Sequence, residues 1–177
     1  LAAVAHPLIV VLIGEKWLPA AGYLQVICLA GMLYPLHAIN LNMLQVKGRS
    51  DLFLRLEIFK KIVGVLPIVL GIFLGIEIML WGIVLTSFIA YFLNSYYSGR
   101  LINYSLKSQI KDILPSFGMA LCMAIIVYLV GVLFSVPVII QLTLQILTGI
   151  TLILGICEVS RIEEYFYIKQ IVKDKIS

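Results

Sequence analysis

The polar residues that could do chemistry in this chain are few and lie inside apolar segments. His37 and Asn40 share one face of a predicted helix by i, i+3 spacing. A comparable stripe in a later apolar segment consists of Gln141, Gln145 and Thr148. Uncharged polar groups in hydrocarbon cost free energy unless they hydrogen-bond or face water. Each stripe therefore indicates either a hydrated cavity that binds a polar substrate, such as a glycan headgroup, or hydrogen bonds between helices.

Basic residues form a second candidate site between two apolar segments. We define this cytoplasmic basic hinge as Lys47, Arg49, Lys60 and Lys61. Their charges could attract an anionic lipid or a pyrophosphate at the cytoplasmic face. They could equally serve only to fix the topology, because cytoplasmic loops of membrane proteins carry an excess of Lys and Arg.

His37 also has two interpretations. An imidazole titrates near neutral pH, so His37 could couple proton movement to transport. Alternatively, it is a neutral, hydrogen-bonded histidine in the core.

Motifs for enzyme chemistry are missing from the sequence. We find no metal-spaced cluster of His, Cys, Asp or Glu, no Gly-rich phosphate loop and no nucleophile elbow. Three cysteines, Cys28, Cys122 and Cys157, lie within apolar runs and are interpreted as packing residues. We therefore expect no catalytic residue, no metal and no cofactor, and a protein that is not an enzyme.

The composition indicates a polytopic membrane protein. Of the 177 residues, 62% are hydrophobic and 12% are charged, with a mean hydropathy of +1.10. A soluble domain is about 25% charged. The net charge of +4 is interpreted as topological bias rather than as a nucleic-acid interface. Because the chain opens within a hydrophobic run and without Met, we expect it to be the C-terminal piece of a longer protein.

We predict an all-α bundle of about five complete transmembrane helices plus one truncated helix over residues 1–160, followed by a cytoplasmic tail over residues 161–177. Pro35 should kink the second segment, Pro67 should bend the third, Ser50 or Asp51 should cap a helix start, and Glu77 should mark a tight outer turn. All Lys and Arg residues except Lys16 fall in the region 47–61, a second loop or the tail, which places the C-terminus in the cytoplasm. The predicted segments cover residues 1–13, 20–44, 62–76, 78–97, 113–134 and 138–156.

Several short motifs together resemble the C-terminal half of bacterial polysaccharide or O-antigen repeat-unit flippases, the polysaccharide transporter family. That family belongs to the MOP superfamily, which also contains the MATE multidrug exporters and the lipid II flippase. The resembling residues are Leu12-Ile13-Gly14-Glu15-Lys16-Trp17 with Ala20-Ala21, Leu24-Gln25-Val26, Pro35, Asn40, Gly48-Arg49-Ser50-Asp51-Leu52 leading to Lys60-Lys61, and Lys111-Asp112-Ile113-Leu114-Pro115.

The resemblance implies a MATE-like transporter of two pseudo-symmetric helical bundles around a central cavity in the bacterial cytoplasmic (inner) membrane. Its substrate would be an undecaprenyl-pyrophosphate-linked oligosaccharide, moved outward by alternating access, with membrane lipids, the polysaccharide polymerase and the chain-length machinery as partners. In such flippases cavity Arg and Lys residues hold the pyrophosphate. The predicted segments contain no mid-membrane Arg or Lys, which is a departure from that pattern.

Two alternatives stay open. The chain could belong to a membrane-embedded polysaccharide polymerase or acyltransferase, for which a large outer loop rich in Arg, His or acids would argue. It could also belong to a MATE-like exporter of cationic drugs, which would need acidic residues in its cavity.

Overall fold

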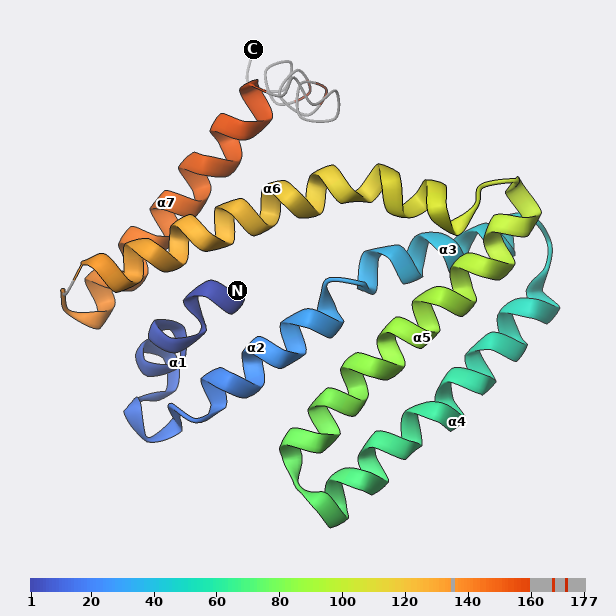
Figure 1. Ribbon diagram of the computed structural model, residues 1–177, viewed down its shortest axis with the longest axis horizontal. Coiled ribbons are helices and arrows are strands. Elements are labelled where there is room, and N and C mark those ends of the chain that lie inside the picture. Colours follow the sequence, from blue (N-terminus) through green and yellow to red (C-terminus); the bar gives the residue numbers. More distant parts are fainter. Residues whose placement is uncertain (135, 160–166, 168–170, 172–177) are drawn as a thin grey trace.

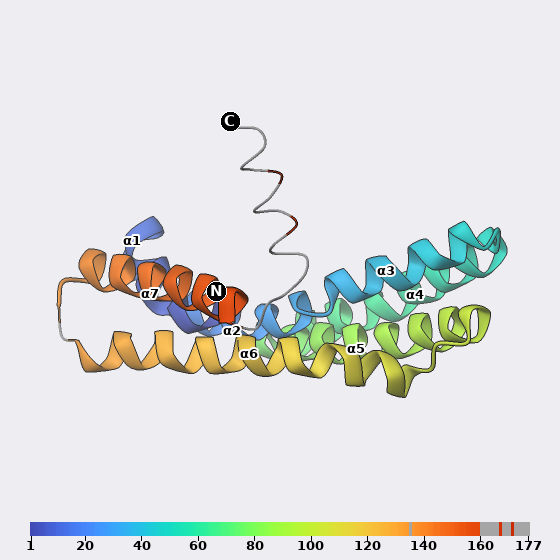
Figure 2. The ribbon, with the colours of Figure 1, turned by 90° about the horizontal axis from the view of Figure 1, so that it is seen from above.

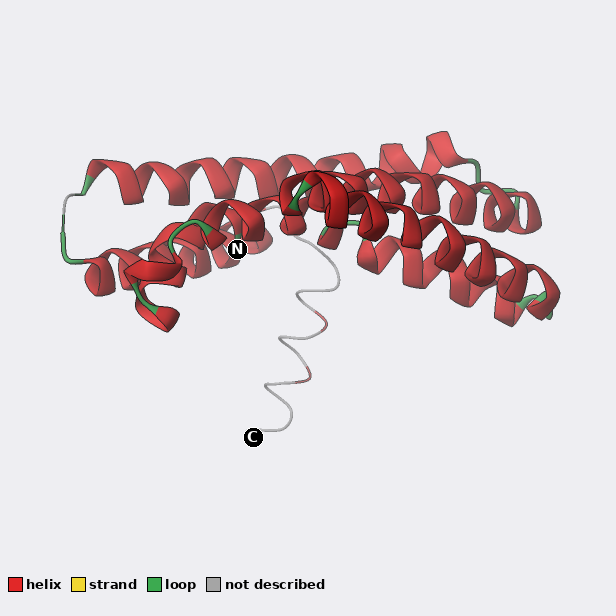
Figure 3. Ribbon diagram, turned by 90° about the horizontal axis from the view of Figure 1, so that it is seen from below, coloured by secondary structure: helices red, strands yellow, loops and turns green. Residues whose placement is uncertain are grey.

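The computed structural model describes residues 1–134, 136–159, 167 and 171, and the elements within them are all helical (Figure 3). The expectation of an all-α protein is confirmed for this part of the chain. The elements are η1 (Ala2–Val4), α1 (Ala5–Ile13), η2 (Glu15–Trp17), α2 (Ala20–Gly31), α3 (Tyr34–Val46), α4 (Ser50–Leu74), α5 (Ile76–Ile102), α6 (Leu106–Leu133) and α7 (Val138–Val159).

The helices form two groups, which α6 connects together with the contacts of α2 with α1 and η1 (Figures 1 and 2). One group contains α2, α3, α4 and α5, with α5 packed against the other three. In the other group α7 packs against α6 and α1, and η1 contacts α6. Seen from above, α6 runs along most of the long dimension, so that its first turns reach α3 and α5 while its second half lies beside α7.

Four helical segments are long and apolar enough to cross a membrane: Ala20–Val46, Ile76–Ile102, Leu106–Leu133 and Val138–Glu158. The chain is therefore membrane-embedded. We predicted about five complete spans, and the difference is α4. Every 18-residue window of α4 includes Glu57, Lys60 and Lys61, so α4 does not meet the same standard of apolarity. Ala2–Ile13 forms a shorter apolar helix.

The second predicted segment is broken rather than kinked at proline. Helix α2 ends at Gly31, two turn residues follow, and α3 begins at Tyr34 with Pro35 in its first turn. A first-turn proline loses no hydrogen bond, because the N–H at that position has no partner within the helix. The interruption falls in the turn just before Pro35 (Figure 1), so the expected disturbance of this segment by Pro35 takes the form of a short break between α2 and α3.

Three further boundaries differ from the predictions. The N-cap of α4 is Arg49, and no side chain caps that helix start, so neither Ser50 nor Asp51 acts as predicted. The tight turn after α4 is at Gly75, whose φ of 100° suits glycine, while Glu77 lies in the first turn of α5. Helix α6 begins at Leu106, earlier than predicted, because the Ser105 side chain accepts a hydrogen bond from the N–H of Ser108.

Helices α4 and α5 form an antiparallel hairpin with a register fixed by two close approaches. A Cβ added at Gly82 would lie 2.9 Å from the Cβ of Pro67, and one added at Gly71 would lie 2.5 Å from the Cβ of Met79. Helix α4 continues through Pro67, which is buried at this contact. These two contacts bring the backbones of α4 and α5 together. They also show which residue of α5 lies opposite each residue of α4.

The two basic connections lie at the same end of the bundle. The α3–α4 connection carries Lys47 and Arg49, and the α5–α6 region carries Arg100 and Lys107 (Figure 1). This arrangement agrees with the alternation that the charge pattern predicted. The predicted tail over 161–177 lies outside the described residues, apart from residues 167 and 171.

Candidate functional site: a cavity between α3, α4 and α5

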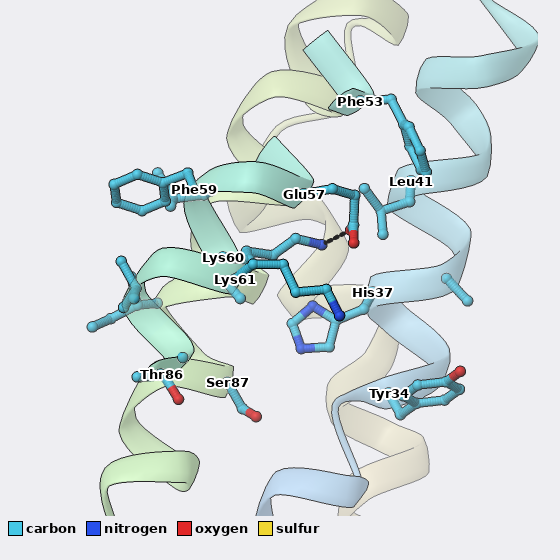
Figure 4. A pocket seen from close by; sticks show the side chains of 16 residues that line it. Tyr34, His37, Leu41, Phe53, Glu57, Phe59, Lys60, Lys61, Thr86 and Ser87 are labelled. Atoms are coloured by element: carbon cyan, nitrogen blue, oxygen red, sulfur yellow. Dashed lines mark hydrogen bonds and ion pairs between the residues drawn. The ribbon is translucent and has the colours of Figure 1, made fainter. Parts of the chain in front are cut away.

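A cavity of about 540 Å³ lies between α3, α4 and α5, and ionisable side chains of α3 and α4 line it (Figure 4). Polar groups come from all three helices. Its polar lining residues are Tyr34 and His37 from α3, Glu57, Lys60 and Lys61 from α4, and Thr86 and Ser87 from α5. Apolar residues such as Leu41 and Phe53 complete the walls.

Lys60 and Lys61 lie further along α4 from the basic end of the bundle than the sequence suggested. From Ser50 to Lys60 α4 rises about 15 Å, at about 1.5 Å per residue. The hairpin contacts pair Pro67 with Gly82, and by antiparallel continuation Lys60 and Lys61 lie opposite residues near 89–90. That level is the middle of α5, which spans Ile76–Ile102. Lys60 and Lys61 precede the predicted segment 62–76, so the prediction that the segments contain no Arg or Lys at mid-membrane depth stays a prediction.

The proposed basic hinge is consequently two separate features. Lys60 and Lys61 extend from α4 toward α3 and line the cavity (Figure 4). Lys47 and Arg49 lie at the end of the bundle, where the Arg49 Nε is 3.0 Å from the Asp51 carboxylate. The hydrogen bond from Arg49 lowers the pKa of the exposed Asp51 from 3.8 to about 2. Neither Lys47 nor Arg49 contributes to the cavity wall.

One of the two cavity lysines has an acidic partner. Lys60 donates to Glu57, which stands three residues earlier on the same face of α4 (Figure 4). The salt bridges among the described residues do not include Lys61. The α4 wall therefore carries two positive charges and one negative charge, and the neutralising pair leaves Lys61 as its excess cation.

His37 lies between the cavity and the buried face of α5. Its Nδ1 is 3.2 Å from the Nδ2 of Asn94, a residue with no exposed surface. The ring also meets the ring of Tyr91 edge-on, with centroids 6.1 Å apart. Both the Tyr91 hydroxyl and the Asn94 Oδ1 are buried without a hydrogen-bond partner among the described residues. The His37 side chain therefore lines the cavity and also lies beside two buried polar atoms that have no hydrogen-bond partner in the described part of the chain, the Tyr91 hydroxyl oxygen and the Asn94 Oδ1.

Asn40 lies one turn further along α3 and belongs to a buried network rather than to the cavity wall. Its Oδ1 accepts from the Ser98 hydroxyl, and its Nδ2 donates to the Oε1 of Gln109 at 3.2 Å. The Ser95 hydroxyl donates to the same Gln109 oxygen at 2.5 Å. The network connects α3, α5 and α6, so the interpretation of Asn40 as an interhelical hydrogen-bonding residue accounts for its contacts.

The later polar stripe forms bonds within the α6–α7 hairpin. The Gln141 Nε2 donates to the Gly131 carbonyl at 2.6 Å, and the Gln145 Nε2 donates to the Val127 carbonyl at 3.0 Å. Thr148 donates to the carbonyl of Leu144 in its own helix. None of the three stripe residues lines the cavity between α3, α4 and α5.

The chain matches no protein-family profile, no curated protein sequence and no solved structure. The site must therefore be judged from its own chemistry.

The cavity can accommodate a polar group of net negative charge. It offers the ammonium group of Lys61, the paired Lys60, and hydroxyls from Tyr34, Thr86 and Ser87. Charge-assisted hydrogen bonds from such groups are stronger than neutral ones. No group of three or more His, Cys, Asp or Glu residues in the described part of the chain could hold a metal ion.

Sequence reasoning found His37, Lys60 and Lys61 but missed the other polar lining residues. Glu57 and Lys60 are three apart, which is a recognisable helical ion-pair spacing. Thr86 and Ser87 interrupt an otherwise apolar segment and could have been noted for that reason. Tyr34 gave no signal, because an aromatic residue there also fits a lipid-facing position.

Proposed function

We propose that this chain forms part of a membrane transporter that moves undecaprenyl-pyrophosphate-linked oligosaccharide repeat units across the bacterial cytoplasmic membrane. The pathway would be O-antigen, capsule or exopolysaccharide biosynthesis. The observation that carries the proposal is a cavity with Lys60 and Lys61 at the middle level of α5. A lysine at such depth is costly unless it pairs or faces a polar space, and it often marks a substrate path.

A broken helix beside the cavity supports the same function. Transporters commonly build substrate sites from discontinuous transmembrane helices, because irregular backbone at membrane depth is tolerated where it lines a cavity. The interruption between α2 and α3 immediately precedes Tyr34 and His37, which both line the cavity. The resemblance of the basic and turn motifs to polysaccharide flippases supplies the choice of substrate.

The charge of the cavity favours an anionic cargo over a cationic one. A MATE-like exporter of cationic drugs would need an unpaired acid, and the cavity acid Glu57 is bound to Lys60. A pyrophosphate would instead compensate the excess charge of Lys61. In this proposal the pyrophosphate occupies the cavity while the polyprenyl chain stays in the lipid.

The test uses the full-length protein in liposomes that contain a fluorescent polyprenyl-pyrophosphate oligosaccharide, with its leaflet followed by a membrane-impermeant quencher. We expect Lys61→Gln to slow translocation about tenfold or more, since a hydrogen bond to a charged group contributes about 1.5–3 kcal/mol. Lys47→Gln is the matched control, because it removes the same charge outside the cavity. Equal rates for the two variants would contradict the assignment of the cavity.

A second experiment separates the transporter from a polymerase or acyltransferase. The gene is deleted in its own host, and lipid-linked repeat units are measured by leaflet. We expect complete units to accumulate on the cytoplasmic face and to be cleared by the intact gene. Units that reach the outer leaflet but stay unpolymerised or unmodified would overturn the flippase proposal in favour of the enzyme.

A further inference from the structure

The contact between His37 and Asn94 leaves one buried acceptor unused. Asn94 is fully buried, and its Nδ2 lies 3.2 Å from the Nδ1 of His37. Its Oδ1 has no hydrogen-bond partner among the described residues. An unpaired buried carbonyl costs free energy and calls for an explanation, such as a catalytic or switching role.

With both its Nδ2 and its unused Oδ1, Asn94 can offer the Nδ1 of His37 a hydrogen-bond partner in either protonation state. In the neutral tautomer with its proton on Nε2, the Nδ1 of His37 accepts a hydrogen bond from the Asn94 Nδ2. In the protonated imidazole both ring nitrogens are donors, so Nδ1 needs an acceptor. A half-turn of the Asn94 amide exchanges Nδ2 for Oδ1 and supplies that acceptor at the same place. His37 can therefore gain or lose a proton without losing its bond between α3 and α5.

The charges around His37 couple its protonation to the content of the cavity. The ionisable groups that face it are Tyr34 on its own helix, Glu57, Lys60 and Lys61 on α4, and Tyr91 on α5. Glu57 and Lys60 neutralise each other, so a proton on His37 would add to the charge of Lys61. An anion in the cavity would compensate both charges. Binding of the anion and of the proton must then strengthen each other by the same factor.

We propose that His37 with Asn94 is a proton-binding site of this cavity, and that a proton and the anionic headgroup of the substrate occupy the cavity together. This inference rests on the proposed function for the identity of the anion. The proton would come from water in the cavity, bind to Nδ1 of His37, and leave when the anion leaves. Substrate movement would therefore be linked to proton movement through one side chain.

The two histidines of the chain allow a direct test. In the full-length protein, ¹⁵N-labelled at histidine and placed in lipid nanodiscs, assignment of His6 and His37 by single substitutions isolates the His37 signals. We expect the ring nitrogens to show a protonation step as the pH is lowered, because the imidazole is a group that proteins use for proton binding. Inorganic pyrophosphate should increase the protonated fraction at fixed pH, and Lys61→Gln should remove that increase. A His37 that stays neutral throughout, or whose titration ignores pyrophosphate, would overturn the proposal.

Substitutions at Asn94 test whether its amide bonds to His37 in both protonation states. Asn94→Asp offers only acceptors when ionised and should enlarge the protonated fraction at fixed pH, whereas Asn94→Leu offers neither group and should reduce it. Because a carboxylate beside His37 favours its protonated form by charge alone, Asn94→Leu is the variant that decides. A purely structural Asn94 would leave the titration of folded Asn94→Leu unchanged. Should Asn94→Leu fail to fold, Asn94→Ala removes the same amide with a smaller side chain, and an unchanged titration there would likewise overturn the role of the Asn94 amide in both protonation states.

The readout also separates this inference from the proposed function. Titration of His37 that responds to pyrophosphate, without any oligosaccharide translocation, would keep the proton site and reject the flippase. Oligosaccharide translocation by a protein whose His37 stays neutral would keep the flippase and reject the proton site.

Discussion

Two regions of this protein carry polar residues at the same helical spacing, yet they use them differently. In the α6–α7 hairpin, the amide nitrogens of Gln141 and Gln145 donate to backbone carbonyls of α6. Around the α3–α4–α5 cavity, Lys61 has no salt-bridge partner among the described residues, and the Asn94 oxygen is unsatisfied. Spacing alone therefore does not distinguish a structural stripe from a binding one. An unsatisfied amide oxygen does not distinguish the regions either, because the Gln145 Oε1 is also buried without a hydrogen-bond partner among the described residues. The distinction lies in charge: the α3–α4–α5 cavity contains the ammonium group of Lys61, and the hairpin stripe is uncharged.

Substitutions in the α6–α7 hairpin should change the free energy of unfolding but not the translocation rate. A Cβ at Gly131 would collide with the Gln145 amide and crowd that of Gln141. We expect Gly131→Val to destabilise the protein by about 1–3 kcal/mol, the usual cost of overpacking. Gly118→Val in the same helix is the matched control, because nothing lies within 4 Å of a Cβ there.

The measurement is the free energy of unfolding in detergent, together with the translocation rate per folded molecule. Equal destabilisation by the two glycine substitutions would show that helix propensity, rather than the glutamine contact, sets the cost. A lower translocation rate per folded Gly131→Val molecule would extend the functional region into the hairpin and break the comparison.

Asn40 lies at the border between the two kinds of region and should behave as a structural residue. Asn40→Ala leaves the Ser98 hydroxyl and part of Gln109 without their partner. We expect a loss of about 1 kcal/mol in unfolding free energy, near the average for interhelical bonds in membranes or slightly above it. Asn42→Ala, on the exposed side of α3, should cost less. A transport defect without loss of stability would instead assign Asn40 to the substrate path.

The sequence was sufficient to predict an all-helical chain with long apolar segments, because long apolar runs between basic loops are typical of such proteins. It did not predict where each helix begins and ends, since α4 begins at Ser50 and α6 at Leu106, ahead of the predicted segments 62–76 and 113–134. It was insufficient for the cavity, because the depth of Lys60 and Lys61 depends on how α4 and α5 are paired. That pairing follows from the turn at Gly75 and the contact of Pro67 with Gly82, and neither is visible in local spacing.

The buried partners were missed for a related reason. Asn94 and Ser98 are four residues apart and share a face of α5, which was a usable signal. Which neighbour each one bonds to depends on tertiary packing between α3, α5 and α6. The break before Tyr34 did have a local signal, because Pro35 predicted a disturbance of the helix within the preceding turn.

The smallest expected effect concerns the ion pair at the end of the bundle. Arg49 depresses the pKa of Asp51 from 3.8 to about 2, so the pair contributes stability that is complete above pH 3.8 and is lost as the pH falls through about 2. Both side chains are exposed, so solvent screening keeps the contribution small. Asp51→Asn should therefore lower the unfolding free energy only slightly at pH 5, and the difference from the unmodified protein should disappear as the pH falls below about 2. Its translocation rate should match that of the unmodified protein, whereas Lys61→Gln should be slow. If the Asp51→Asn variant also translocates substrate slowly, the α3–α4 connection belongs to the binding site. The charge at the end of the bundle would then matter as much as the charge in the cavity.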